Sequence, residues 1–161
     1  MAYDIEIRDL EKNYSGEHAL AGVSVSISRG CLYGLIGADG AGKSTLLRIC
    51  TTLVAADKGT VSVCGLDTVR DFRAIRAQIG YMPQKFSLYQ DLSVRENMQF
   101  FADLFGVKPA ERDERMARLL DFSRLAPFVN RRARNLSGGM KQKLALSCTL
   151  IHTPQVLFLD E

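Results

Sequence analysis

Residues 37–45 restrict the possible fold of this chain more than any other segment. They read Gly-Ala-Asp-Gly-Ala-Gly-Lys-Ser-Thr, and Gly37, Gly42, Lys43 and Ser44 fit the pattern G-x-x-x-x-G-K-[ST]. In this pattern, backbone N–H groups close around a chain of phosphates, and the dipole of the following helix and the lysine add positive charge. The segment therefore predicts a phosphate-binding loop between a strand and a helix, with the Ser44 hydroxyl placed to bind Mg²⁺.

Length and composition are those of one ordinary globular domain, because the chain has 161 residues and 47% of them are hydrophobic. No apolar run approaches the roughly 18 residues of a membrane span, and the first residues lack the features of a secretory signal, so we expect a cytosolic location. The net charge of +3 is too small and too dispersed to indicate a nucleic-acid partner.

Four cysteines, at positions 31, 50, 64 and 148, lie far apart and form no C-x-x-C pair. They predict neither a zinc site nor a disulfide framework, and we expect them to be small buried hydrophobic residues. Arg131, Arg132 and Arg134 form the one concentration of positive charge. A solvated loop is the favoured interpretation of this run, and a role near phosphate stays open because Ser137 follows so closely.

Apolar periodicity predicts mainly strands up to residue 36, the last of them over residues 32–36. It then predicts a helix over residues 43–52 and strands over 59–63 and 79–82. From Ser93 onward the pattern is helical. Three helices are expected, one starting at the capping box of Ser93 and Glu96, one near Pro109 and one at Ser137. In the second helix, Glu111–Arg115 and Glu114–Arg118 are expected as ion pairs four residues apart.

The last residues form an apolar strand that ends in Asp160 and Glu161. A buried parallel strand has this character, with its functional groups at its carboxyl end. We therefore divide the chain into a β-rich nucleotide-binding lobe over residues 1–92, a helical subdomain over 93–154 and a returning strand over 155–161. Because a native domain seldom ends at such a strand, we expect the chain to be part of a longer one.

Ser137, Gly138 and Gly139 begin the third predicted helix. A serine cap needs no glycines after it, and glycine in a helix costs up to about 1 kcal/mol relative to alanine. Two glycines there expose backbone N–H groups to the close approach of an anion. The segment thus predicts a second phosphate-facing element, with a simple flexible cap as the alternative.

Three segments together, residues 37–45, 136–143 and 156–161, have the order and rough spacing of an ABC-type ATPase subunit, which this chain resembles over essentially its whole length. Gln84, after the strand over residues 79–82, is similar to the family's glutamine loop. Residues 80–94 look like the ATP-binding subunits of ABC-2 type exporters, including bacterial multidrug exporters. The resemblance implies an α/β P-loop NTPase fold with a parallel core sheet, an antiparallel β edge and an inserted helical subdomain.

The resemblance also implies a role for each matching residue. Tyr14 would stack on adenine, Gln84 would sense Mg²⁺ and the attacking water, Asp160 would support the metal and Glu161 would polarise that water. The phosphates would be held by Gly37, Ala38, Asp39, Gly40, Ala41, Gly42, Lys43, Ser44 and Thr45. Ser137, Gly138 and Gly139 would contact the γ-phosphate of ATP that is held by a second subunit.

The implied ligands are ATP and Mg²⁺, and the implied protein partners are a second copy, in a head-to-tail pair that shares two ATPs, and a separate integral membrane permease. The permease would dock near Gln84, Lys85 and Phe86 and the helical subdomain, which places the chain at the cytoplasmic face of the cell membrane. ATP binding would close the pair, and hydrolysis would release it and drive export.

Two departures from the family pattern stand out. Ala38 and Asp39 replace the usual proline and asparagine, and Asp39 adds a negative charge near the phosphates. The chain also stops before the family's γ-phosphate histidine, so residues 1–161 alone are expected to hydrolyse ATP poorly. Three alternatives remain open: a soluble ABC protein acting on ribosomes, DNA or iron–sulfur assembly, a P-loop kinase, which does not explain Ser137 to Gly139, and a non-catalytic remnant.

Overall fold

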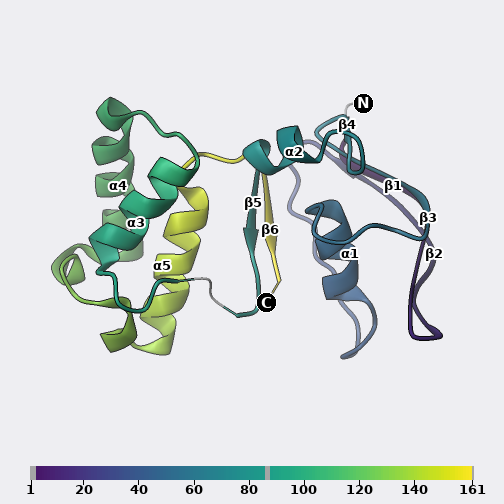
Figure 1. Ribbon diagram of the computed structural model, residues 1–161, viewed down its shortest axis with the longest axis horizontal. Coiled ribbons are helices and arrows are strands. Elements are labelled where there is room, and N and C mark those ends of the chain that lie inside the picture. The colour runs from purple at the N-terminus through teal and green to yellow at the C-terminus, as the bar shows by residue number, and fades with distance from the viewer. Residues whose placement is uncertain (1–2, 86–87, 161) are drawn as a thin grey trace. The chain divides into compact units, whose positions relative to one another are not determined.

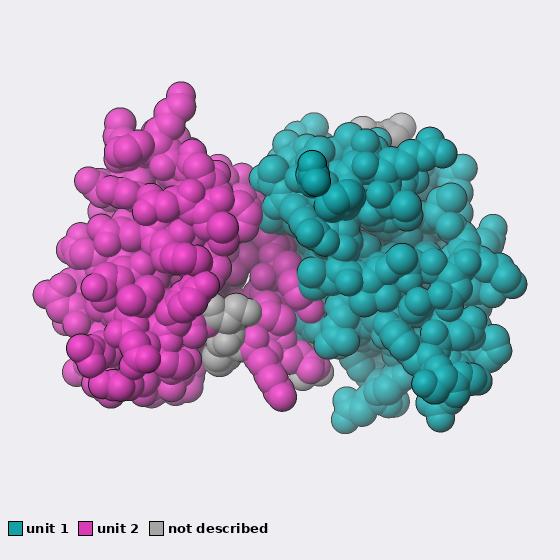
Figure 2. All heavy atoms as spheres, in the orientation of Figure 1, with its two compact units in different colours: residues 1–79, 155–160 teal, residues 80–154, 161 magenta. Residues whose placement is uncertain are grey.

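The computed structural model describes residues 3–85 and 88–160. They form two compact units (Figure 2): unit 1 contains the residues up to 79 together with 155–160, and unit 2 contains residues 80–154. Among the described residues, no helix is both long enough and apolar enough to cross a lipid bilayer.

Unit 1 contains a four-stranded antiparallel sheet (Figure 1) with the strand order β2-β1-β3-β4. Its strands are β1 (Tyr3–Tyr14), β2 (Glu17–Ser28), β3 (Lys58–Val63) and β4 (Leu66–Asp67). Ile5 and Ile7 of β1 are buried, as are Val61 and Val63 of β3, which pair with them across the ladder. The alternation of apolar residues therefore faces one side of the sheet, as the period of two predicts.

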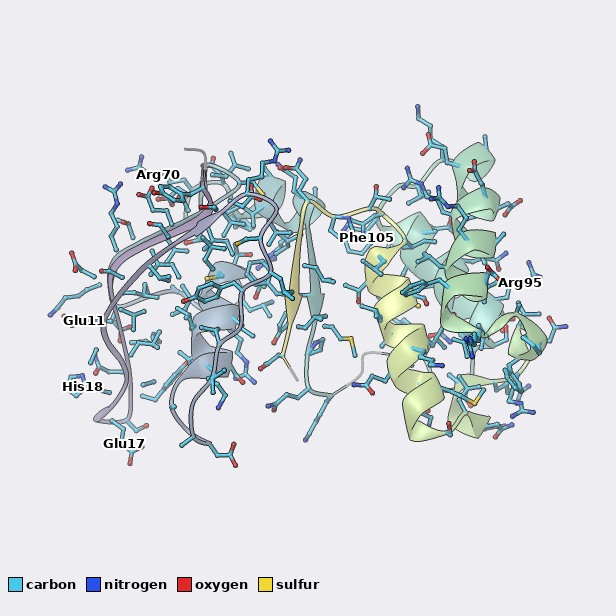
Figure 3. All side chains as sticks on the ribbon, turned by 180° about the vertical axis from the view of Figure 1, so that it is seen from behind. Glu11, Glu17, His18, Arg70, Arg95 and Phe105 are labelled. Carbon is cyan, nitrogen blue, oxygen red and sulfur yellow. The ribbon has the colours of Figure 1, made fainter. Side chains whose placement is uncertain are left out.

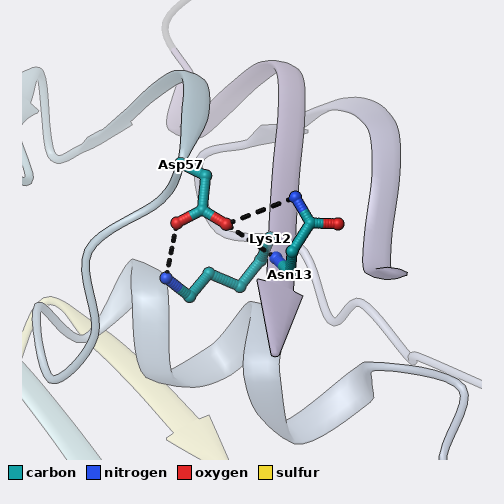
Figure 4. A network of polar contacts seen from close by, with 3 residues as sticks. All are labelled: Lys12, Asn13 and Asp57. Atoms are coloured by element: carbon teal, nitrogen blue, oxygen red, sulfur yellow. Dashed lines mark hydrogen bonds and ion pairs between the residues drawn. The ribbon is translucent and has the colours of Figure 1, made fainter. Parts of the chain in front are cut away.

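The carboxylate of Asp57 ties the approach to β3 to the end of β1 (Figure 4). It accepts hydrogen bonds from Lys12 Nζ and from the backbone N–H of Asn13, both at 2.7 Å. The hydrogen bond from Lys12, followed by that from Asn13, lowers the pKa of Asp57 below its ordinary value. This contact fixes the chain immediately before Tyr14, the last residue of β1.

Helix α1 (Lys43–Cys50) packs into unit 1 through Leu46, Ile49 and Cys50, which are buried. Helix α2 (Phe72–Gln78) also belongs to this unit, although the sequence analysis did not predict it. Arg76 of α2 donates hydrogen bonds to the side-chain and backbone oxygens of Thr52, at 2.7 and 2.8 Å. These hydrogen bonds connect α2 to the residues that immediately follow α1.

The expectation of a strand over residues 32–36 is wrong for this structure. Residues 31–38 belong to no helix or strand, and the side chains of Leu32 and Ile36 are fully exposed. An apolar run becomes a buried parallel strand only when neighbouring strands take up its backbone hydrogen bonds, and no ladder among the described residues includes this segment. Of the four cysteines expected to be buried, Cys50 and Cys148 are buried, whereas Cys31 is exposed and Cys64 is half-buried.

Strands β5 (Ile79–Met82) and β6 (Val156–Leu159) form a two-stranded parallel sheet (Figure 1). The boundary between the units falls within β5. Both strands were expected from their apolar runs, and β6 leads directly to Asp160.

Unit 2 is helical. It consists of α3 (Val94–Leu104), α4 (Pro109–Ser123), α5 (Gly138–Leu150) and the short 3₁₀ turns η1 (Ala126–Phe128) and η2 (Ala133–Asn135). Its core contains Met98 of α3, Met116 of α4 and Leu144 of α5, all at most 2% exposed. The apolar stripes of the three predicted helices are therefore core-packing surfaces.

The predicted starts of these three helices agree with the structure. Both hydrogen bonds of the capping box between Ser93 and Glu96 form at the start of α3. At the other end of α3, the ring of Phe105 (labelled in Figure 3) stacks on His152, with the ring centroids 3.8 Å apart.

In α4, Arg115 pairs with Glu111 at 2.6 Å, as expected. The other expected pair, Glu114 with Arg118, is not among the ion pairs of the described residues.

Candidate functional site

The loop before α1 adopts a backbone conformation that needs glycine. Gly40 and Gly42 have φ angles of 79° and 85°, which side chains rarely tolerate. At Gly42 the space is also closed, because an added Cβ would lie 2.2 Å from the carbonyl oxygen of Ala19. The turn is closed by a 3.2 Å hydrogen bond from the N–H of Ala41 to the carbonyl of Ala38.

The N-terminus of α1 is open to an anion. Its cap is Gly42, which offers no side-chain hydrogen bond, and the first turn carries no acidic residue. The first N–H groups of an α-helix have no partner within the helix, and the helix dipole makes this end partly positive. An anion placed at this turn would therefore meet backbone donors that no side chain already occupies.

Lys43 bends back over the same loop. Its Nζ donates hydrogen bonds to the carbonyl oxygens of Gly37 and Ala38, both at 2.8 Å. The ammonium charge is thus held inside the turn, where it would attract phosphate oxygens. Asp39 is exposed in this loop.

Ser44 and Asp160 bring two oxygen ligands together. The Ser44 hydroxyl donates a 2.7 Å hydrogen bond to Asp160 Oδ1, and the Asp160 residue is only 4% exposed. Hydroxyl and carboxylate oxygens suit Mg²⁺, which is usually held by one or two protein ligands together with phosphate oxygens and waters. The described residues contain no cluster of three or more His, Cys, Asp or Glu side chains that could hold a metal ion alone. The pair therefore fits a Mg²⁺ that arrives with a phosphate ligand.

Tyr14 lies at the end of β1, in the same unit as the loop. Its side chain is 43% exposed, and Lys12 Nζ lies 5.4 Å from the centroid of its ring. Strand β2, which pairs with β1 beside Tyr14, also supplies the Ala19 carbonyl that lies against Gly42. The ring has free surface on which a flat group could stack.

The remaining predicted site residues belong to unit 2, apart from Glu161, which lies outside the described residues. Gln84 is exposed after Pro83. The Ser137 hydroxyl caps α5 by accepting a 3.3 Å hydrogen bond from the N–H of Met140. Gly138 and Gly139 are exposed, and a Cβ added at either would have no atom within 4 Å. The structure thus brings together Lys43, Ser44 and Asp160, and it describes Gln84 and the tip of α5 in the other unit.

Asn97 is a polar residue that the sequence analysis missed. It is fully buried in α3 and makes hydrogen bonds to three backbone residues of the segment 89–93. The signal in the sequence was faint: a single asparagine next to Met98 in a stripe that otherwise packs as core.

Comparison with known proteins places this geometry in context. The family model described as ABC transporter matches residues 20–161. The chain is 48% identical over 159 residues to the probable multidrug ABC transporter ATP-binding protein YbhF of Escherichia coli (strain K12). It is 38% identical over 157 residues to the Nod factor export ATP-binding protein I of Paraburkholderia xenovorans (strain LB400). Each match covers 98% of this chain, but only 28% and 52% of the respective relatives.

Among solved structures, the chain resembles a dimeric, post-hydrolysis state of the ATP-binding cassette MJ0796 bound to ADP and Pi, with a TM-score of 0.87 and 26% identity. That match covers 98% of this chain and 73% of the other.

Proposed function

Because the chain belongs to the ABC transporter family, we propose that it binds MgATP at residues 37–45 and supplies the ATP-hydrolysing part of a membrane exporter. The observation that carries this proposal is the meeting of Lys43, Ser44 and Asp160 at the N-terminus of α1. A phosphate chain bound there would take up the free N–H groups of the first turn. Lys43 would exchange its two carbonyl partners for phosphate oxygens.

The metal would be held by Ser44 and Asp160. A Mg²⁺ ion bound there would neutralise the negative charge that develops on the phosphates during hydrolysis. The Ser44 hydroxyl and the Asp160 carboxylate would give up their shared hydrogen bond, and each would contact the ion through an oxygen. Gln84 is proposed to orient the attacking water near the metal.

Glu161, beside Asp160 in the sequence, is the proposed general base. A carboxylate within hydrogen-bond reach of a water can accept its proton as the water attacks the γ-phosphate. Tyr14 is the proposed adenine platform, because half of its side chain is free and it belongs to the same unit as the loop.

A second copy is proposed to complete the site through Ser137, Gly138 and Gly139. Within the described residues, a Cβ added at either glycine would meet no atom, so packing does not exclude a side chain there. They suit the approach of a phosphate from outside. The resemblance to a dimeric ATP-binding cassette bound to ADP and Pi supports this arrangement.

Export is the proposed use of the hydrolysis cycle, since two relatives are named for multidrug transport and Nod factor export. ATP that contacts two copies would favour the closed pair, and loss of the γ-phosphate would release it. A separate membrane permease would dock at residues 84–86 and at the helical unit, at the cytoplasmic face of the cell membrane.

A nucleotide-trapping experiment on the longer protein tests the proposal. Glu161→Gln should retain MgATP binding and accumulate a nucleotide-bridged pair, detected as a dimer by size-exclusion chromatography with light scattering. Adding Lys43→Ala to that variant should abolish the pair, whereas adding Lys58→Ala, on the surface of β3, should leave it unchanged. A monomer in saturating MgATP would overturn the shared site, and undiminished ATP binding after Lys43→Ala would overturn the function itself.

A further inference from the structure

The side chain of Asn97 is hydrogen-bonded to the backbone of residues 89–93, the loop that precedes α3. Its Oδ1 accepts a hydrogen bond from the N–H of Tyr89 at 2.9 Å, and its Nδ2 donates to the carbonyl oxygens of Tyr89, Leu92 and Ser93 at 3.0, 3.2 and 2.9 Å. The side chain is fully buried beside Met98. A buried amide is tolerated in an apolar core only when its hydrogen bonds are made, and all of these go to the backbone of residues 89–93.

This loop is in turn bound to the segment that leads to Ser137. The N–H groups of Ala133 and Arg134 donate to the carbonyl oxygens of Leu92 and Gln90, at 2.8 and 2.9 Å. On the other side of the loop, the N–H of Val94 donates to the carbonyl of Arg131 at 3.0 Å. The turn η2 then closes with a bond from the N–H of Leu136 to the carbonyl of Ala133, one residue before Ser137.

The buried amide holds the loop more strongly than the nearby ion pair. Arg134 Nη1 lies 2.9 Å from Asp91 Oδ1, but the two side chains are 52% and 82% exposed. Solvent-exposed pairs contribute little, whereas each buried polar group that loses its partner bears its full desolvation cost. Among the side chains that contact residues 89–93 through hydrogen bonds or ion pairs, Asn97 is therefore the one whose loss should disturb the loop most.

We propose that Asn97 is a positioning residue for Ser137, Gly138 and Gly139. Its hydrogen bonds position the loop 89–93, and that loop accepts hydrogen bonds from Ala133 and Arg134. These two residues in turn position the tip of α5, which is proposed to contact the γ-phosphate of ATP bound to a second copy. The inference rests on the proposed function, and it adds that the position of the α5 tip depends on the loop 89–93. A change at Asn97 should leave the nucleotide loop of its own subunit intact and displace only the tip.

Two variants of the longer protein, Asn97→Asp and Asn97→Ser, test this. Each loses the Nδ2 donor, and the aspartate sets a carboxylate against three carbonyl oxygens. We expect the monomer's Kd for MgATP to stay within about twofold of the parent, while kcat and the nucleotide-bridged pair fall by roughly tenfold or more. Amide hydrogen exchange should accelerate at Ala133 and Arg134 and stay unchanged in the middle of α4.

A surface variant decides the question if the buried variants do not fold. Asp91→Lys places a lysine beside Arg134. The repulsion should displace the loop 89–93 from residues 133–134, so kcat should fall by about two- to fivefold. Adding Arg134→Glu to it restores opposite charges and should restore kcat, which a merely structural role of either residue does not predict.

Two results would overturn the inference: exchange at Ala133 and Arg134 that stays slow in folded Asn97 variants, or exchange that accelerates while kcat stays within twofold of the parent. If the Asn97 variants do not fold, the inference would also be overturned if Asp91→Lys combined with Arg134→Glu fails to restore kcat. Failure of the proposed function is distinguishable, since it would appear as an unchanged affinity for MgATP after Lys43→Ala in the parent background.

Discussion

Ser44 Oγ lies 2.7 Å from Asp160 Oδ1, although 116 positions separate the two residues. The hydroxyl comes from the first turn of α1 and the carboxylate from the end of β6. Without a metal ion, this hydrogen bond supplies the nearly buried carboxylate with a donor. The same two oxygens are the proposed Mg²⁺ ligands, so we expect a bound metal ion to take the place of this hydrogen bond.

Replacing Ser44 should therefore affect stability as well as metal binding. In the nucleotide-free protein, Ser44→Ala removes one donor to Asp160 and should lower the free energy of unfolding by about 1–3 kcal/mol, measured by urea denaturation. Ser26→Ala, on the exposed part of β2, is the control and should change it by less than about 0.5 kcal/mol. An equal effect of both substitutions would show that the hydrogen bond contributes nothing to stability.

Gly40 and Gly42, two glycines of the same loop, allow the cost of backbone strain to be measured separately from the cost of a steric clash. Gly40 and Gly42 both have positive φ, but only Gly42 has a neighbour within reach of a Cβ, the Ala19 carbonyl oxygen at 2.2 Å. Gly40→Ala should cost about 1–2 kcal/mol for its left-handed conformation alone. Gly42→Ala should cost clearly more, because the backbone of α1 or β2 must also shift. Urea denaturation of both variants provides the measurement, and equal costs would contradict the contact with Ala19.

Much of this fold could be predicted because its signals are local. The capping box of Ser93, the helix start at Pro109 and the apolar strand over residues 156–159 each depend on a few neighbouring residues, and all three agree with the structure. The run over residues 32–36 failed because its strand conformation depends on partners elsewhere in the chain, which sequence pattern does not supply.

The candidate site divides in the same way. The loop with Gly42, Lys43 and Ser44 is a contiguous pattern, so its residues could be named in advance. Its hydrogen bond from Ser44 to Asp160 was not stated in advance, because it joins two distant segments. Asn97 left only a faint signal, one asparagine in an apolar stripe, because its hydrogen-bond partners are backbone groups of residues 89–93 that carry no side-chain signature.

The cysteines should differ sharply in reactivity. Burial raises the pKa of Cys50 and of Cys148 from the ordinary thiol value of 9.0 to about 12, whereas Cys31 is exposed. Because the thiolate is the nucleophile, iodoacetamide at about pH 8 should modify Cys31 and spare Cys50 and Cys148, as measured by peptide mass spectrometry. In urea all of them should react, and modification of Cys50 at the rate of Cys31 in the folded protein would contradict its burial.

The same two thiols predict a direction for stability at high pH. In the unfolded chain they ionise near 9.0, whereas in the folded protein they keep their protons until about pH 12. Above pH 9 the unfolded state therefore binds fewer protons than the folded state, so the free energy of unfolding should fall as the pH rises from 9 toward 12. Cys50→Ala should make this fall shallower in urea denaturation series, and an unchanged slope would contradict the assignment to buried thiols.

Gly138 and Gly139 should show opposite effects of one substitution on stability and on activity. Neither glycine has a positive φ, and an added Cβ at either would have no atom within 4 Å, so Gly138→Ala and Gly139→Ala fit the folded chain. Because alanine is the better helix former, each should raise the free energy of unfolding by up to about 1 kcal/mol. If the glycines serve the close approach of a phosphate bound to a second copy, the same variants should lose the nucleotide-bridged pair and most of the ATPase activity. Lys141→Ala, at a half-buried position in the first turn of the same helix, should keep the nucleotide-bridged pair and the ATPase activity. A glycine variant that is more stable and equally active would show that this tip does not contact the nucleotide.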